Sequence, residues 1–130
     1  MSIEPGPAPR LGQKWNLLEY VKKGIEFTTM LGTFVLKDQG QQPPIPPPTL
    51  ADLSLHFWHL KDKQDDQAPH KEDEAYFVLQ GHGKLTIEGH IHSLEPGDLI
   101  FVPRCAEHHF SDFEKEGLSV LVIFGPNFTG

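Results

Sequence analysis

Short runs of alternating apolar and polar residues fill the second half of the chain. Seven segments rich in β-branched and aromatic residues follow one another over residues 53–126: LSLHFWHL, EAYFVLQG, GKLTIEG, HIHSL, DLIFVP, HHFSDF and LSVLVIFGP. Turn residues separate them, such as EG at 88–89 and EPGD at 95–98. Because no helical periodicity intervenes, the pattern predicts an all-β fold, an antiparallel sandwich or jelly-roll barrel.

The first residues of the chain follow a different pattern. Residues 1–14 begin with a proline-rich stretch and are expected to form a disordered or loose arm. Residues 15–23 place three apolar residues at helical spacing, and Gly24 is suited to end a helix in the position after its C-cap. The sequence therefore predicts a short N-terminal helix or extended arm.

The segment that follows predicts strands and then a loop. Residues 25–36 read IEFTTMLGTFVL and favour one or two strands interrupted by Gly32. The run QQPPIPPPT at 41–49 predicts a loop, because proline donates no hydrogen bond to a sheet. We expect one domain over residues 15–130, with its core motifs in residues 51–126.

Composition narrows the class of protein. A hydrophobic fraction of 38% in 130 residues suits one modest core. The net charge of −7 argues against a nucleic-acid partner, which needs clustered lysine and arginine. No apolar run approaches the ~20 residues of a membrane span, and a single cysteine, Cys105, fits a reducing compartment. We therefore expect a cytoplasmic protein that binds neither nucleic acid nor membranes.

Four polar side chains share one face of the central segment APHKEDEAYFVLQGHG at 68–83. On a strand, alternation places His70, Glu72, Glu74 and Tyr76 together and leaves the other face apolar. Charged groups in a dry core are costly without partners, so these four must face solvent, a polar network or a metal ion. Such a run alone is more typical of a solvated edge than of a metal site.

A second segment, EPGDLIFVPRCAEHHF at 95–110, carries two histidines. It predicts a turn and then a buried strand at 99–102 that ends at Pro103. His108 follows on the next strand, and His109 faces the opposite side by alternation.

Together, the two segments resemble the two sequence motifs of the cupin family. Glu74 is followed seven residues later by Gly81, and Gly97 is followed six residues later by Pro103 and eleven residues later by His108. The first cupin motif has two histidines, a glutamate and a glycine in order, and the second has a glycine, a proline and a histidine. The resemblance covers roughly residues 51–126 and implies a small single-domain cupin.

The resemblance also implies a set of metal ligands. His70, Glu74 and His108 match ligand positions, whereas Ala68 stands where the family has its first histidine. Two further departures are Cys105 and Asp112 in the second motif. An alternative alignment moves His70 and Glu72 onto the two histidine positions and keeps the same trio. Two histidines and one carboxylate favour non-haem iron, with manganese, zinc or nickel as alternatives, and Glu72 is a candidate fourth ligand.

The same alternation predicts the walls of a ligand pocket. Tyr76 and Val78 continue the face of Glu74, and Phe110 continues that of His108, so these residues are candidates for substrate binding. The hydroxyl of Tyr76 is the candidate catalytic group, because it can orient a ligand or donate a proton. Simple packing of Tyr76 in the core is an equally good interpretation.

The remaining histidines are weaker candidates. His56 shares a face with Trp58, and His82 lies in a turn; either can touch a ligand, although a hydrogen-bonded or surface histidine is the simpler expectation. His90 and His92 lie in a predicted hairpin and are expected in solvent, so replacing His90 should change nothing measurable.

The resemblance implies a function in general terms only. A metal-dependent enzyme that acts on a small oxygen-containing molecule is expected, of dioxygenase, isomerase or lyase type, including an Fe(II) dioxygenase. The alternative is a non-catalytic cupin that binds a sugar or another small molecule. A homodimer is expected too, because apolar N-terminal strands such as TFVL at 33–36 favour pairing between copies.

Overall fold

The computed structural model describes residues 12–32, 53–61 and 71–125, and the structural statements that follow concern these residues. Several positions discussed above lie outside them. They are most of the N-terminal arm (1–11), the strand segment 33–36, the proline-rich loop 41–49, and the residues Ala68 and His70.

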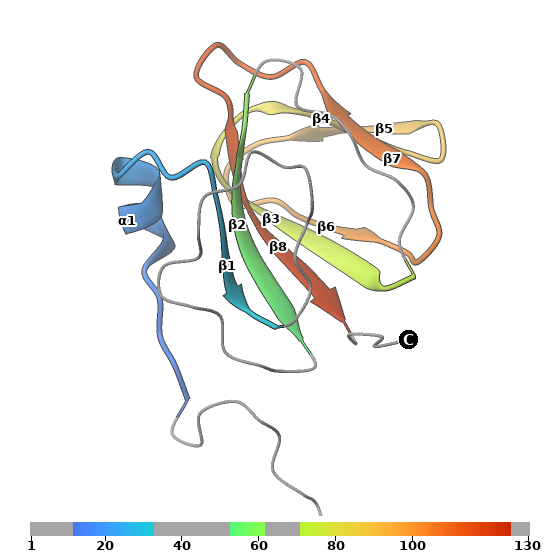
Figure 1. Ribbon diagram of the computed structural model, residues 1–130. Helices are drawn as coiled ribbons and strands as arrows, with labels where there is room; N and C mark the ends of the chain where they lie inside the picture. The colour runs from blue at the N-terminus through green and yellow to red at the C-terminus, as the bar shows by residue number, and fades with distance from the viewer. Residues whose placement is uncertain (1–11, 33–52, 62–70, 126–130) are drawn as a thin grey trace, which may run out of the picture.

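The described chain folds into two antiparallel sheets that face each other (Figure 1). Its elements are α1 (Leu17–Lys22), β1 (Phe27–Leu31), β2 (Ser54–Leu60), β3 (Asp73–Gly81), β4 (Gly83–Ile87), β5 (His90–Leu94), β6 (Leu99–Val102), β7 (His108–Ser111) and β8 (Leu118–Gly125). The larger sheet has the order β1-β2-β8-β3-β6, and the smaller one has the order β5-β4-β7. The predicted all-β sandwich is confirmed, and each of the seven segments beyond residue 51 forms a strand.

The predicted N-terminal helix is also present. The side-chain oxygen of Asn16 accepts hydrogen bonds from the first turn of α1, and Gly24 follows the C-cap with a φ of 68°. Tyr20 packs edge-on against Phe57, with ring centroids 5.6 Å apart, and so attaches α1 to β2. No helix in this part of the chain has the length and hydrophobicity needed to span a membrane.

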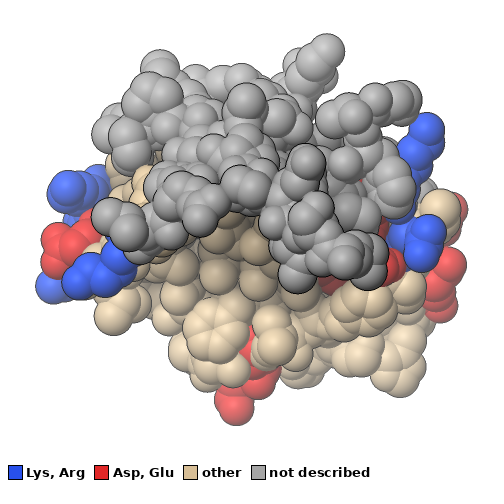
Figure 2. All heavy atoms as spheres, turned by 90° about the horizontal axis from the view of Figure 1, so that it is seen from below, with Lys and Arg blue, Asp and Glu red and all other residues tan. Residues whose placement is uncertain are grey.

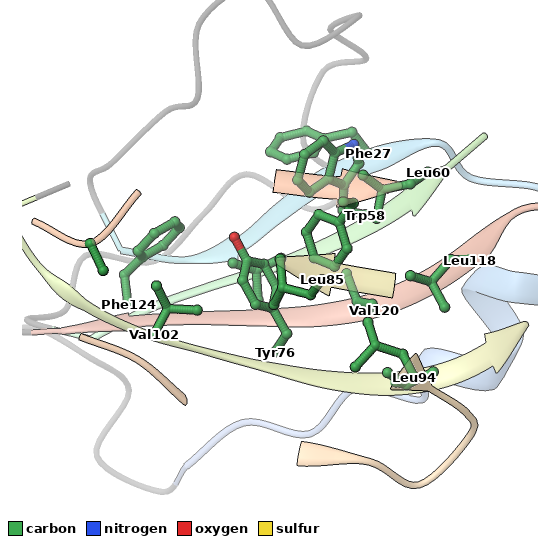
Figure 3. Close-up of a cluster of buried hydrophobic side chains, with 14 residues drawn as sticks. Phe27, Trp58, Leu60, Tyr76, Leu85, Leu94, Val102, Leu118, Val120 and Phe124 are labelled. Atoms are coloured by element: carbon green, nitrogen blue, oxygen red, sulfur yellow. The ribbon is translucent and has the colours of Figure 1, made fainter. Parts of the chain in front are cut away.

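Aromatic side chains join the two sheets in the core. Tyr76 of β3 packs edge-on against Phe110 of β7, with centroids 4.9 Å apart, and Trp58 of β2 approaches the same ring at 6.1 Å. All three side chains are almost fully buried. Figure 3 shows Tyr76 within this cluster, with its hydroxyl pointing toward the end where Phe124 and Val102 lie.

The prediction that residues 99–102 form a buried strand is wrong for two of the four side chains. Leu99 and Phe101 are 67% and 59% exposed, whereas Val102 is buried. The reason is that β6 is the edge strand of the larger sheet, and its outward side chains have no layer over them. An apolar run does not itself reveal whether both faces of a strand are covered.

Charged side chains are unevenly spread over the described surface. In the view of Figure 2, uncharged residues cover most of the described middle, acidic residues lie at its lower edge, and lysine and arginine lie toward the two sides. The ion pairs of this part of the chain include Lys22 with Glu19, Lys61 with Glu26 and Lys84 with Asp112. Each joins exposed or half-exposed groups and adds little to stability.

Gly81, the glycine of the first motif, has a structural role. Its φ is 91°, and a Cβ there would overlap the carbonyl oxygen of Gly117, because the ends of β3 and β8 approach each other closely. Gly89 also has a positive φ, 81°, but faces open space. Gly81 and Gly89 therefore share a positive φ and differ mainly in whether a Cβ atom would overlap neighbouring atoms.

This difference predicts unequal losses of stability on substitution by alanine. We expect Gly89→Ala to lower the free energy of unfolding by about 1 kcal/mol, from backbone strain alone. Gly81→Ala should lower it by roughly 3 kcal/mol or more, because the β3–β8 pairing must also shift. Urea denaturation of both variants tests this, and equal losses would contradict the steric explanation.

His56 is a core histidine on the inner face of β2, the face it shares with Trp58. Its Nδ1 lies 2.9 Å from the hydroxyl of Thr29, and its ring stacks on Phe27 and meets Phe124 edge-on. Burial lowers the pKa of His56 to about 4, because a charged imidazole would lose its hydration there. The folded protein thus holds this histidine neutral at pH 5 to 7.

A neutral buried histidine predicts a stability loss in acid. The unfolded chain takes up this proton near pH 6.5 and the folded protein only near pH 4, so stability falls as the pH drops through that window. Between pH 7.5 and 4.5 we expect a loss of about 2.5 kcal/mol from this group. Urea denaturation of wild type and His56→Gln at both pH values measures it, since the variant should lack this component. An equal loss of stability in wild type and His56→Gln between the two pH values would show that His56 is not the cause.

Candidate functional site

Three polar side chains meet in the interior between the sheets. Glu74 and Tyr76 come from β3, where alternation points both inward, and His108 begins β7 in the opposite sheet. Their exposed fractions are 2%, 0% and 3%. Polar groups so deeply buried need specific partners, so their mutual geometry decides what the site can do.

His108 is held between a backbone carbonyl and a carboxylate. Its Nδ1 lies 2.9 Å from the carbonyl oxygen of Ala106, and its Nε2 lies 3.0 Å from Oε1 of Glu74. Because a carbonyl only accepts, Nδ1 carries the proton of that hydrogen bond. A neutral His108 then turns a lone pair toward the carboxylate, so this contact requires either a proton or a cation at Nε2.

Tyr76 completes the polar cluster. Its hydroxyl lies 3.4 Å from Nε2 of His108. Burial raises the pKa of Tyr76 well above its usual value, and the charge of Glu74 and a hydrogen bond to its carboxylate raise it further. Tyr76 therefore keeps its proton at neutral pH and acts as a hydrogen-bond donor.

The carboxylate of Glu74 has few other partners. No backbone N–H, lysine or arginine of the described ranges reaches its oxygens, although both are buried. A buried carboxylate is costly unless a positive charge compensates it. The site as a whole thus favours a cation next to Glu74 and His108.

The geometry of this pair suits a shared metal ion. Two donor atoms about 2.1 Å from one ion and at a right angle lie about 3.0 Å apart, which is the separation between Oε1 of Glu74 and Nε2 of His108. Metal-binding histidines commonly donate their other ring N–H to a backbone carbonyl, as His108 does to Ala106. The two residues therefore fit as neighbouring ligands.

The other predicted ligands are not brought together with them here. His70 lies outside the described residues. Glu72 is buried, with 9% of its surface exposed. Within residues 12–32, 53–61 and 71–125, no three His, Cys, Asp or Glu side chains form a group that could hold a metal. The described chain thus supplies two of the predicted ligands, Glu74 and His108.

The predicted pocket walls are placed near these ligands. Val78 and Phe110 are fully buried, and Phe110 packs against the ring of Tyr76. His56 lies on the same inner face as Tyr76, separated from it by Val122 of β8. These side chains surround Tyr76 with a dry environment.

His82 lies elsewhere. It follows Gly81 at the far end of β3, and the seven residue steps from Glu74 to Gly81 span about 23 Å of strand. Its exposed ring forms an ion pair with Glu114 and lines a pocket of about 260 Å³ together with His59. The structure therefore separates His82 from the buried cluster.

Three features of the structure could not be derived from the sequence motifs. The carbonyl of Ala106 orients His108, and no side chain signals such a role. His59 bonds to the hydroxyl of Ser119 at 2.7 Å, and burial lowers its pKa. A larger hollow of about 440 Å³ lies at the start of β3, and its lining includes Glu74 together with Ala75 and Phe101.

Comparison with known proteins places this chain in a family. The cupin domain family matches residues 57–124, just over half of the chain. The chain is 37% identical over 62 residues to an uncharacterised protein of Streptomyces coelicolor, covering 48% of this chain and 58% of that protein. It is 38% identical over 82 residues to an acireductone dioxygenase of Bacillus thuringiensis, covering 59% of this chain and 44% of that enzyme. The chain thus spans about half the length of these relatives.

Solved structures agree on the fold. A protein of Photorhabdus luminescens superimposes with a TM-score of 0.56 at 19% identity, covering 76% of this chain and 72% of that one. The DMSP lyase DddQ of Ruegeria pomeroyi gives a TM-score of 0.60 at 18% identity, covering 97% of this chain and 58% of that one. At such identities the likeness concerns architecture alone. From its two facing sheets, its two motifs and the family match over residues 57–124, the chain belongs to the cupin family.

Proposed function

We propose that His70, Glu74 and His108 hold one divalent metal ion between the two sheets. The observation that carries this proposal is the buried contact of 3.0 Å between Glu74 and His108, with the other ring nitrogen of His108 bound to a carbonyl. Sequence alternation and the motif add His70. Glu72 stays the candidate fourth ligand from strand alternation alone, because its carboxylate does not form a group with Glu74 and His108 in the described residues. Iron, manganese, zinc and nickel all suit such a ligand set.

The proposed activity is enzymatic, on a small molecule that carries an oxygen donor. A bound divalent ion supplies Lewis acidity toward that oxygen or a centre for reaction with O₂. The likeness to acireductone dioxygenase over 82 residues supports an oxygen-using reaction on an enol or diketone. Isomerase and lyase reactions at the same centre are the alternatives within this proposal.

The role of Tyr76 follows from its surroundings. Its hydroxyl stays protonated, lies against Glu74 and His108, and is held by packing against Phe110. A group in this position can donate a hydrogen bond or a proton to an oxygen bound beside it. Phe110 and Val78 exclude water around the hydroxyl of Tyr76, which strengthens such an interaction.

The homodimer and the cytoplasmic location that the sequence leads us to expect stay predictions.

Replacing His108 tests the metal site directly. We expect His108→Ala to bind the ion at this buried site at least about tenfold more weakly than wild type does, because a buried ligand is lost. The matched control is His109→Ala, since His109 is exposed on the opposite face of β7 and should leave metal content unchanged. Elemental analysis after dialysis against each ion measures this. Wild-type metal content in folded His108→Ala would refute the ligand assignment.

Replacing Tyr76 separates catalysis from metal binding. We expect Tyr76→Phe to keep its metal and to lose about 10²- to 10⁴-fold in turnover, because only the hydroxyl is removed. Oxygen consumption with diketones and catechols measures the rate, and Tyr20→Phe on α1 is the control. Undiminished turnover in Tyr76→Phe would exclude the proposed role. Metal binding without turnover of any candidate would favour the non-catalytic binding module instead.

A further inference from the structure

Two histidine rings lie side by side on β5. His90 and His92 alternate along the strand and therefore share a face, and their ring centroids are 4.7 Å apart at an interplanar angle of 61°. His90 is exposed and His92 is half-buried, on the edge strand of the smaller sheet. Within the part of the chain described here, neither ring has a hydrogen bond or an ion pair. Both imidazoles thus keep nitrogen lone pairs available to a ligand.

The spacing of the rings suits one shared ion. A coordinating nitrogen about 2.1 Å from an ion places the centroid of its ring about 3.2 Å away. Two such rings have centroids about 4.5 Å apart at a right angle and about 5.2 Å apart at a tetrahedral angle. The observed 4.7 Å lies between these values.

The surroundings of the pair also suit a cation. His92 lines a hollow of about 420 Å³ between β5 and β6, and the charged side chain among its lining residues is Asp98. Lys84 on the neighbouring strand pairs with Ser93 in register, so its side chain leaves on the opposite face, where it binds Asp112. A cation beside His90 and His92 therefore has room for water ligands and meets no lysine from β4.

This pair is distinct from the buried site. His90, Ile87 and His108 lie in one row across β5, β4 and β7, so the side chain of Ile87 stands between the two histidines. No third His, Cys, Asp or Glu of the described segments joins either pair.

We propose that His90 and His92 form a second metal site, which binds a divalent transition-metal ion through two imidazoles and completes its coordination with water. Zn²⁺, Ni²⁺ and Cu²⁺ are the ions that imidazole ligands favour. The sequence alone predicts that replacing His90 changes nothing measurable. That prediction assumes that His90 and His92 are two separate solvated groups. Their shared face and the ring spacing make them a chelating pair.

Equilibrium dialysis of the 130-residue chain against Zn²⁺ tests this proposal. We expect two ions on wild type, one on His108→Ala, one on His90→Ala and none on the double variant His90→Ala/His108→Ala. His92→Ala should match His90→Ala, with affinity at the second site lowered about tenfold or more, because a two-ligand site loses half its ligands. His109→Ala, on the outer face of the same sheet, should bind as wild type does.

The outcomes separate the two sites. A loss of one ion in His90→Ala, whatever His108→Ala does, supports the site on β5. If His108→Ala binds as many Zn²⁺ ions as wild type does, the buried site is contradicted and the site on β5 is not. Zn²⁺ uptake by His90→Ala and His92→Ala equal to that of wild type overturns the second site. Because both rings reach solvent, these variants should remain folded, and circular dichroism checks that they do.

Discussion

The contact between Glu74 and His108 is the constraint on which the rest of this protein depends. A carboxylate and an imidazole lie 3.0 Å apart with almost no exposure to water, each from a different sheet. Removing two such groups from solvent costs several kcal/mol apiece unless they compensate each other or share a cation. The sandwich can therefore close only when β3 and β7 bring both groups to the same point, and this couples the fold to the chemistry of its interior.

The surrounding core holds this contact in place by packing. Phe110, two residues beyond His108, packs on Tyr76, two residues beyond Glu74, so a row of aromatic contacts runs beside the polar contact. At the other end of β3, Gly81 allows β8 to approach closely and fixes the strand along its length. One end of β3 thus carries the polar cluster and the other end anchors the sheet. A site on such rigid strands keeps its geometry without help from mobile groups.

The sequence predicts the parts of this arrangement that depend on local alternation. Strand positions, the shared face of Glu74 and Tyr76, and the order of the two motifs follow from period-two patterns and spacing, whereas the inward direction of that face is implied only by the resemblance to cupins. Exposure of Leu99 and Phe101 could not be predicted, because it depends on the edge position of β6 in the finished sheet. The carbonyl of Ala106 has no side-chain signal either. His82 lies in a motif but far from Glu74, since a fully extended strand separates them.

The two proposed metal sites use the same imidazole chemistry in different dielectric surroundings, and this sets their relative strength. At the buried site Glu74 and His108 would replace part of an ion's water, and the carboxylate would attract the ion in a low dielectric, where attraction is several times stronger than in water. His90 and His92 carry no such charge, and their ion keeps part of its hydration shell next to solvent. The buried ligands must therefore bind more tightly and exchange more slowly, whereas the pair on β5 should follow the free-ion concentration. If both proposed sites bind metal, the imidazole group would thus act as a tight ligand in the interior and as a weak ligand at the surface.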